Sequence, residues 1–84
     1  MPYTVSIKSK AVTALEKINE PDYAAIKNAI NNLATDPRPH GCKKLKGRDG
    51  YRIRAGDYRI IYNIFDKILT VDVIALGHRK DIYE

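Results

Sequence analysis

The sequence predicts an α+β domain in which a two-helix hairpin covers one face of a small antiparallel sheet, in the order β-α-α-β-β-β. Three observations predict this class. Residues 2–8 alternate apolar and polar side chains, residues 9–36 repeat apolar side chains every three or four positions, and residues 51–76 are rich in β-branched and aromatic residues. A chain of 84 residues is the size of one domain, so we expect residues 1–84 to fold as a single unit.

The first strand and the two helices are predicted from the N-terminal part of the chain. The stretch PYTVSIK at residues 2–8 has the period of two that is typical of a half-buried strand. Ser9 is a suitable cap for a short helix, and Pro21 suits the first turn of a second one. Asp36 precedes a proline, which disfavours the helical backbone and ends the second helix. The apolar positions expected to face the sheet are Ala11, Leu15 and Ile18 in the first helix and Tyr23, Ile26, Ile30 and Leu33 in the second.

The C-terminal half is predicted to be a loop followed by a β-meander. Residues 37–50 are rich in Pro, Gly and Lys, which indicates a loop with a short edge strand around Lys43–Lys46. The breaks at Gly56-Asp57 and Asp66-Lys67 are each two residues long, and such breaks are typical of tight hairpin turns. The three strands of the meander are then Tyr51–Ala55, Tyr58–Phe65 and Ile68–Leu76.

Strand pairing by parity places three arginines on one face of this sheet. A two-residue turn near Gly56 puts Arg52 and Arg54 on the same face as Arg59, and we call this the arginine face. A turn at Asp66-Lys67 extends the arginine face to Thr70, Asp72, Ile74 and Leu76. The other face is apolar and is expected beneath the helices, which leaves the arginine face open to solvent. That apolar face collects Tyr51, Ile53, Ala55, Tyr58, Ile60, Tyr62, Ile64, Leu69, Val71, Val73 and Ala75.

The basic charge is concentrated in one quarter of the chain. The net charge is +5, and residues 38–59 alone carry eight basic and two acidic side chains. Such a cluster is the electrostatic footprint of a protein that binds a polyanion, although a solvated basic face that only aids solubility is the alternative. We expect contacts to this polyanion from the basic side chains of the loop, which are Lys43, Lys44, Lys46 and Arg48.

Other features of the composition exclude several classes of function. Cys42 is the single cysteine, so the chain has no internal disulfide and no multi-cysteine metal site. No ligand cluster for a metal or cofactor is evident, and none is predicted. The chain has no apolar run long enough to span a bilayer and no signal peptide. We therefore expect a cytoplasmic protein without a membrane partner.

The clustered arginines point to a bound anion. Like charges directly opposed in a sheet destabilise it by roughly 0.2–1 kcal/mol, and Asp57 and Asp72 are the acids expected nearby to compensate. A cluster kept at that cost indicates an anionic ligand, most simply a phosphate, because guanidinium groups bind phosphate bidentately. Arginines that merely shield the solvent face of the sheet remain the alternative.

The run YRIRAGDYRIIYNIFDKILTVDVIALGHRKDIYE, with the preceding KLKG, resembles the RelE/ParE toxin superfamily, and within it the RelE-type ribosome-dependent mRNA interferases. The likeness covers essentially the whole chain, and its strongest elements are GDYRIIY and GHRKDIY. The resemblance implies a type II toxin that enters the ribosomal A site and cuts the mRNA codon there without a metal. The 2′-hydroxyl of the RNA attacks the adjacent phosphate, which gives a 2′,3′-cyclic phosphate and a 5′-hydroxyl.

The resemblance also implies roles for single residues. Arg59 matches the arginine that holds the scissile phosphate, Arg79 the arginine that stabilises the transition state or protonates the leaving oxygen, and Tyr83 the tyrosine that stacks on the target base. Arg52 and Arg54 stand where some members have two lysines. Arginine stays protonated in proteins, so these two can stabilise charge but are poor bases. We therefore expect His78 to act as the acid or base near neutral pH, with a plain loop or RNA-contacting role as the alternative.

Two other functions are consistent with the same fold. One is a ParE-like toxin that inhibits DNA gyrase, and the other is a non-catalytic module that binds RNA or an antitoxin. Either toxin assignment implies a cognate RelB-like antitoxin, acidic or amphipathic, beside the ribosome and mRNA as partners. We expect the antitoxin to dock on apolar side chains beside the arginines, which are Ile61, Phe65, Ile68 and Ile74.

Overall fold

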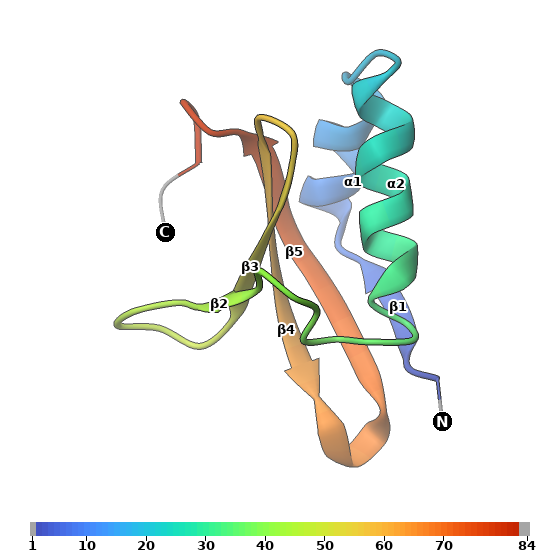
Figure 1. The fold of residues 1–84 in the computed structure, drawn as a ribbon, viewed down its shortest axis with the longest axis vertical. Helices are drawn as coiled ribbons and strands as arrows, with labels where there is room; N and C mark the ends of the chain where they lie inside the picture. The colour runs from blue at the N-terminus through green and yellow to red at the C-terminus, as the bar shows by residue number, and fades with distance from the viewer. Residues whose placement is uncertain (1, 83–84) are drawn as a thin grey trace.

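The computed structural model describes residues 2–82 and confirms the predicted α+β class. Two helices lie side by side against one face of a twisted sheet (Figure 1). The loop after the second strand and the C-terminal segment lie on the other side of that sheet. The elements in chain order are β1 (Thr4–Ile7), α1 (Ser9–Glu16), α2 (Asp22–Asn32), β2 (Lys43–Lys44), β3 (Tyr51–Ala55), β4 (Tyr58–Phe65), the 3₁₀ turn η1 (Asp66–Ile68) and β5 (Thr70–His78).

The sheet has five strands in the order β1-β5-β4-β3-β2. β2 confirms the short edge strand expected in the loop, although it is limited to two residues. β1 pairs with β5 in parallel, from Thr4 opposite Thr70 to Ile7 opposite Val73, so the sheet is mixed and not wholly antiparallel as predicted. An alternating sequence indicates a strand but not its direction, which here follows from the helices that carry the chain away from β1.

The β3–β4 hairpin has the predicted register. Its turn is Gly56-Asp57, and Gly56 has a φ of +60°, the left-handed conformation that a type II′ turn requires at its first position. Arg54 lies directly opposite Arg59, and Arg52 lies opposite Ile61. Directly opposed residues share a face, so the three arginines lie on the same face of the sheet.

The β4–β5 hairpin differs from the predicted one in both its turn and its register. The chain passes through η1 and then Leu69, whose φ of 48° is left-handed, before β5 begins. A β-bulge follows, because Tyr62 is opposite Val73 while Ile61 is opposite Ala75, and Ile74 is the extra residue between them. Beyond the bulge, the residues of β5 therefore point to the opposite faces of the sheet from those that the unbulged register predicts.

This reversal corrects the predicted position of Leu76. The unbulged register placed Leu76 on the arginine face, but it pairs with Ile60 and is only 5% exposed in the core. Ala75, predicted on the apolar face, instead lies opposite Ile61. The bulge therefore turns the larger side chain towards the helices.

The core lies between the helices and the apolar face of the sheet. α1 packs on β5, and α2 packs against β3. The buried cluster confirms most of the predicted core positions. Its members are Ala11, Leu15, Ile26, Ile30, Leu33, Ile53, Ile60, Tyr62, Val71, Val73 and Leu76.

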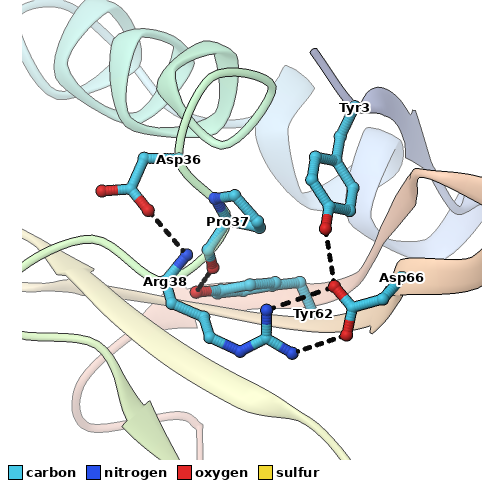
Figure 2. Close-up of polar contacts among 6 residues, drawn as sticks. All are labelled: Tyr3, Asp36, Pro37, Arg38, Tyr62 and Asp66. Atoms are coloured by element: carbon cyan, nitrogen blue, oxygen red, sulfur yellow. Dashed lines mark hydrogen bonds and ion pairs between the residues drawn. The ribbon is translucent and has the colours of Figure 1, made fainter. Parts of the chain in front are cut away.

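A polar network fastens the segment after α2 to the sheet (Figure 2). The buried Tyr62 hydroxyl donates to the carbonyl oxygen of Pro37 at 2.8 Å, and burial raises the pKa of Tyr62. The Arg38 guanidinium donates to both Asp66 oxygens, at 3.2 and 2.9 Å, and the Tyr3 hydroxyl donates to Asp66 at 2.6 Å. One carboxylate therefore joins the N-terminus, the segment after α2 and the β4–β5 connection.

Asp66 should make the stability of the protein sensitive to acid. Its hydrogen bonds with Arg38 and Tyr3 hold the pKa of Asp66 below its ordinary value. A carboxylate whose pKa is lower in the folded state stabilises the fold fully above the unfolded-state pKa, about 3.9, and loses that contribution as the pH falls through the folded-state value. Asp66→Asn should therefore be less stable than the wild type at pH 7, with the difference closing below about pH 4. Urea unfolding at several pH values measures this, and a difference that stays constant with pH would contradict it.

Candidate functional site

Three arginines meet at a small pocket at the Gly56-Asp57 end of the sheet. Arg54 and Arg59 come from the opposed positions of β3 and β4, and Arg79 follows β5 directly. The pocket has a volume of about 90 Å³. Its lining residues are Arg54, Gly56, Asp57, Tyr58, Arg59 and Arg79. We call it the arginine pocket. Arg54 and Arg79 are exposed and Arg59 is half-buried, so their charges can reach a ligand from solvent.

Asp57 holds Arg79 at the edge of this pocket. The Arg79 backbone N–H donates to the Asp57 carbonyl oxygen at 2.8 Å, and the Arg79 Nε lies 3.9 Å from Asp57 Oδ1. These contacts continue the β4–β5 pairing by one position beyond the Tyr58–His78 pair. The sequence did not predict them, because the unbulged register placed Asp57 opposite Leu76.

Arg52 is on the predicted face but does not lie open to solvent as predicted. Its neighbours in the sheet are Lys43 and Ile61, and it is only 2% exposed. The arginine face is not bare, because the loop after β2 and the C-terminal segment lie on that side (Figure 1). The predicted open cluster of Arg52, Arg54 and Arg59 is therefore replaced by Arg54, Arg59 and Arg79 around one pocket.

A second pocket shows what covers this face. It has a volume of about 370 Å³ and lies over Ile61 and Ala75, which are directly opposed. Arg48 lines it from the loop after β2, and Asp81 and Ile82 line it from the C-terminal segment. Two loops that the β-patterns could not place therefore enclose the middle of the arginine face.

The structure corrects the position predicted for His78. The unbulged register put His78 at the end of the arginine face, but His78 lies opposite Tyr58. The two rings pack edge to face, and their centroids are 5.5 Å apart. The His78 Nδ1 accepts a hydrogen bond from the Lys80 N–H at 3.2 Å. Because the bulge at Ile74 reverses the alternation, the imidazole is on the side of Tyr58 and not with Arg54 and Arg59. Tyr83, the other predicted C-terminal site residue, lies outside the described residues.

The four basic residues predicted to bind RNA are exposed but do not form one surface. Lys43 is opposite Arg52 and Lys44 is opposite Tyr51, so consecutive lysines lie on different faces. The Lys44 ammonium is 5.2 Å from the centre of the Tyr51 ring, and the Arg38 guanidinium is 5.3 Å from it. Lys46 and Arg48 belong to the loop that follows β2.

The apolar positions predicted for antitoxin docking are also separated. Ile61 is 3% exposed, and Ile74 is half-buried at the bulge. Phe65 and Ile68 are exposed, but they lie at the β4–β5 connection. The predicted apolar patch beside the arginines is therefore not present as one surface.

Among residues 2–82, no three His, Cys, Asp or Glu side chains gather where they could hold a metal ion. No helix in the same range is both long enough and apolar enough to cross a membrane.

The fold and the pocket define a small basic α+β protein that presents a cluster of three arginines at one end of its sheet. The sequence profile described as "ParE toxin of type II toxin-antitoxin system, parDE" matches residues 5–83. The chain is 34% identical to "Toxin RelG" from Mycobacterium tuberculosis over 99% of this chain and 98% of that protein.

Solved structures agree with the sequence comparison. The archaeal RelE-RelB complex from Pyrococcus horikoshii superimposes with a TM-score of 0.84 at 31% identity, over 98% of this chain and all of that one. The E. coli RelBE toxin-antitoxin complex gives a TM-score of 0.77 at 26% identity, over 90% and 95% of the two chains. The chain therefore belongs to the RelE/ParE family, as a RelE-type toxin of a type II toxin–antitoxin system.

Proposed function

We propose that this RelE-type toxin is a ribosome-dependent mRNA endonuclease that acts in the cytoplasm. The observation that carries the proposal is the arginine pocket, where Arg54, Arg59 and Arg79 surround a volume of about 90 Å³. Guanidinium groups that converge from two strands and a following turn suit the several oxygens of one phosphodiester. Relatives named as RelE toxins, and their solved complexes with RelB, support the same assignment.

In the proposed reaction, the 2′-hydroxyl oxygen of the RNA attacks the adjacent phosphorus and the bond from phosphorus to the 5′ oxygen breaks. The products are a 2′,3′-cyclic phosphate and a 5′-hydroxyl, and the proton lost by the 2′ oxygen balances the one gained by the 5′ oxygen. Negative charge builds on the non-bridging oxygens at the pentavalent transition state. Preorganised guanidinium groups from Arg54, Arg59 and Arg79 would stabilise that charge, which is the contribution this chain is best equipped to make.

Arg52 and His78 have different places in this proposal from those the sequence suggested. Arg52 is buried beside the pocket, so we assign it an electrostatic role through its neighbours and no direct contact with RNA. His78 faces Tyr58, so we do not assign it proton transfer in the arginine pocket. Lys43, Lys46 and Arg48 are exposed and remain proposed contacts to RNA phosphates around the site.

The cognate partner is proposed to be a RelB-like antitoxin. Solved relatives are complexes of RelE with RelB, which supports an antitoxin as partner of this chain. The sequence pI of about 9.4 favours an acidic partner, and one that covers the arginine pocket would exclude RNA from it.

A reconstituted translation reaction tests the proposed function. Purified toxin is added to ribosomes stalled on a defined mRNA, and cleavage positions are mapped by primer extension. We expect cuts within the A-site codon, a 5′-hydroxyl on the downstream fragment, and no cleavage of the same mRNA without ribosomes. Intact mRNA together with inhibited DNA supercoiling would favour gyrase inhibition, since the matching family profile carries the ParE name. Intact mRNA with normal supercoiling would favour a non-catalytic binding module.

A further inference from the structure

We propose that Asp57 is a positioning residue that holds the Arg79 guanidinium in the arginine pocket for turnover. The inference rests on the proposed function and extends it to a residue that does not itself contact the phosphate. It is drawn from the two contacts between Asp57 and Arg79 and from the charge of the pocket that both residues line.

Arg79 lacks the support that the other two arginines have. Arg54 and Arg59 are a directly opposed pair within β3 and β4, whereas Arg79 follows the last residue of β5 and its side chain is 60% exposed. A long exposed side chain samples many rotamers unless a partner selects one. The Asp57 carbonyl oxygen, 2.8 Å from the Arg79 N–H, fixes the Arg79 backbone, and the Asp57 carboxylate, 3.9 Å from the Arg79 Nε, is the partner for the side chain.

The charge of the pocket gives the second argument. Of the described residues that line it, Asp57 alone is acidic, and the other charged members are three arginines. A carboxylate in a phosphate pocket repels the ligand and competes with it for the guanidinium groups. An exposed ion pair of this kind also contributes little to stability. The presence of the Asp57 carboxylate in the pocket, despite both disadvantages, is explained if it orients the Arg79 side chain before RNA binds.

A role for Asp57 in repelling the ligand and a role in positioning Arg79 predict different effects on the cleavage rate. Asp57→Asn keeps the backbone carbonyl and the size of the side chain but removes the charge. If Asp57 only repels the ligand, the substitution should tighten RNA binding and leave the cleavage rate unchanged or higher. If Asp57 positions Arg79, single-turnover cleavage should fall about 10- to 100-fold while the affinity for ribosome-bound mRNA stays equal or rises.

Asp72→Asn is the matched control, because it removes the same charge from the arginine face at a position paired with Lys8 at 3.6 Å. We expect it to cut at close to the wild-type rate. Asp57→Glu, which restores a carboxylate, should recover part of the rate lost in Asp57→Asn. Equal losses in Asp57→Asn and Asp72→Asn would overturn the proposal, because they would indicate a general effect of charge.

Two further measurements make the test specific to Arg79. In the Arg79→Ala background, Asp57→Asn should cause no additional loss of rate, and an undiminished additional loss would overturn the proposal. The Arg79 Nε–Hε NMR signal should shift or broaden in Asp57→Asn and stay unchanged in Asp72→Asn. This NMR signal is recorded without RNA. If the wild type leaves mRNA intact, the proposed function is wrong, and the NMR comparison still decides whether Asp57 holds Arg79. An unchanged Arg79 signal in Asp57→Asn would overturn the inference.

Discussion

Replacing Arg59 by alanine should lower the rate of ribosome-dependent mRNA cleavage by about 100- to 1000-fold, the usual effect of removing one preorganised donor from a transition-state site. Arg59 is half-buried, lines the arginine pocket and directly opposes Arg54, so its guanidinium is held in place by the sheet. The fold should survive, because the substitution also relieves repulsion between two opposed guanidinium groups. Primer extension measures the cleavage, and thermal unfolding confirms that the variant is folded.

Two comparisons make the Arg59 result interpretable. Arg59→Lys keeps the charge but loses the bidentate geometry, so we expect an activity between those of the wild type and Arg59→Ala. Lys67→Ala removes a cation from the exposed β4–β5 connection, outside the arginine pocket, and should cut at the wild-type rate. Full cleavage by Arg59→Ala would show that the pocket is not the catalytic site.

Replacing Leu76 by alanine should lower the free energy of unfolding by about 2–5 kcal/mol, which is the range for removing a large buried aliphatic side chain. Leu76 is 5% exposed and pairs with Ile60 in the core because the bulge turns it towards the helices. Chemical denaturation followed by circular dichroism measures the change. A loss of this size would be a large part of the stability of an 84-residue protein.

Ile74→Ala is the natural control for the bulge. Ile74 is half-buried at the irregularity, on the same strand and two residues before Leu76. We expect a clearly smaller loss of stability from Ile74→Ala than from Leu76→Ala. The unbulged register puts the side chains of Ile74 and Leu76 both on the arginine face. Similar small losses of stability in Ile74→Ala and Leu76→Ala would therefore argue for the unbulged register.

The sequence predicts most of this fold because its strongest patterns are local. Alternation identified β1, helical spacing identified the faces of α1 and α2, and the Gly56-Asp57 turn fixed the register of β3 against β4. The shared face of Arg52, Arg54 and Arg59 followed from that turn alone. The resemblance to RelE toxins, carried by GDYRIIY and GHRKDIY, is confirmed by the family profile and the solved relatives.

The parts of the site that sequence reasoning missed depend on longer-range geometry. A bulge adds one residue without leaving a glycine or proline to mark it, so the positions of Leu76 and His78 were predicted wrongly. The arginine face that carries the buried Arg52 is covered from the loop after β2 and from the C-terminal segment, and neither has a periodic pattern that would place it. Asp57 meets Arg79 because the bulge shifts the register of β4 against β5, which brings Asp57 next to the pair formed by Tyr58 and His78.

The parallel pairing of β1 with β5 has a consequence for biosynthesis. Thr4 is opposite Thr70, so the first strand to leave the ribosome pairs with the last strand to be made. Contacts this distant along the chain close late, because they carry the largest loop entropy. The nascent polypeptide thus cannot complete its sheet, or bring Arg79 to Asp57, until β5 has been synthesised and has left the ribosome. Under the proposed function, the arginine pocket is therefore among the last parts of the protein to form.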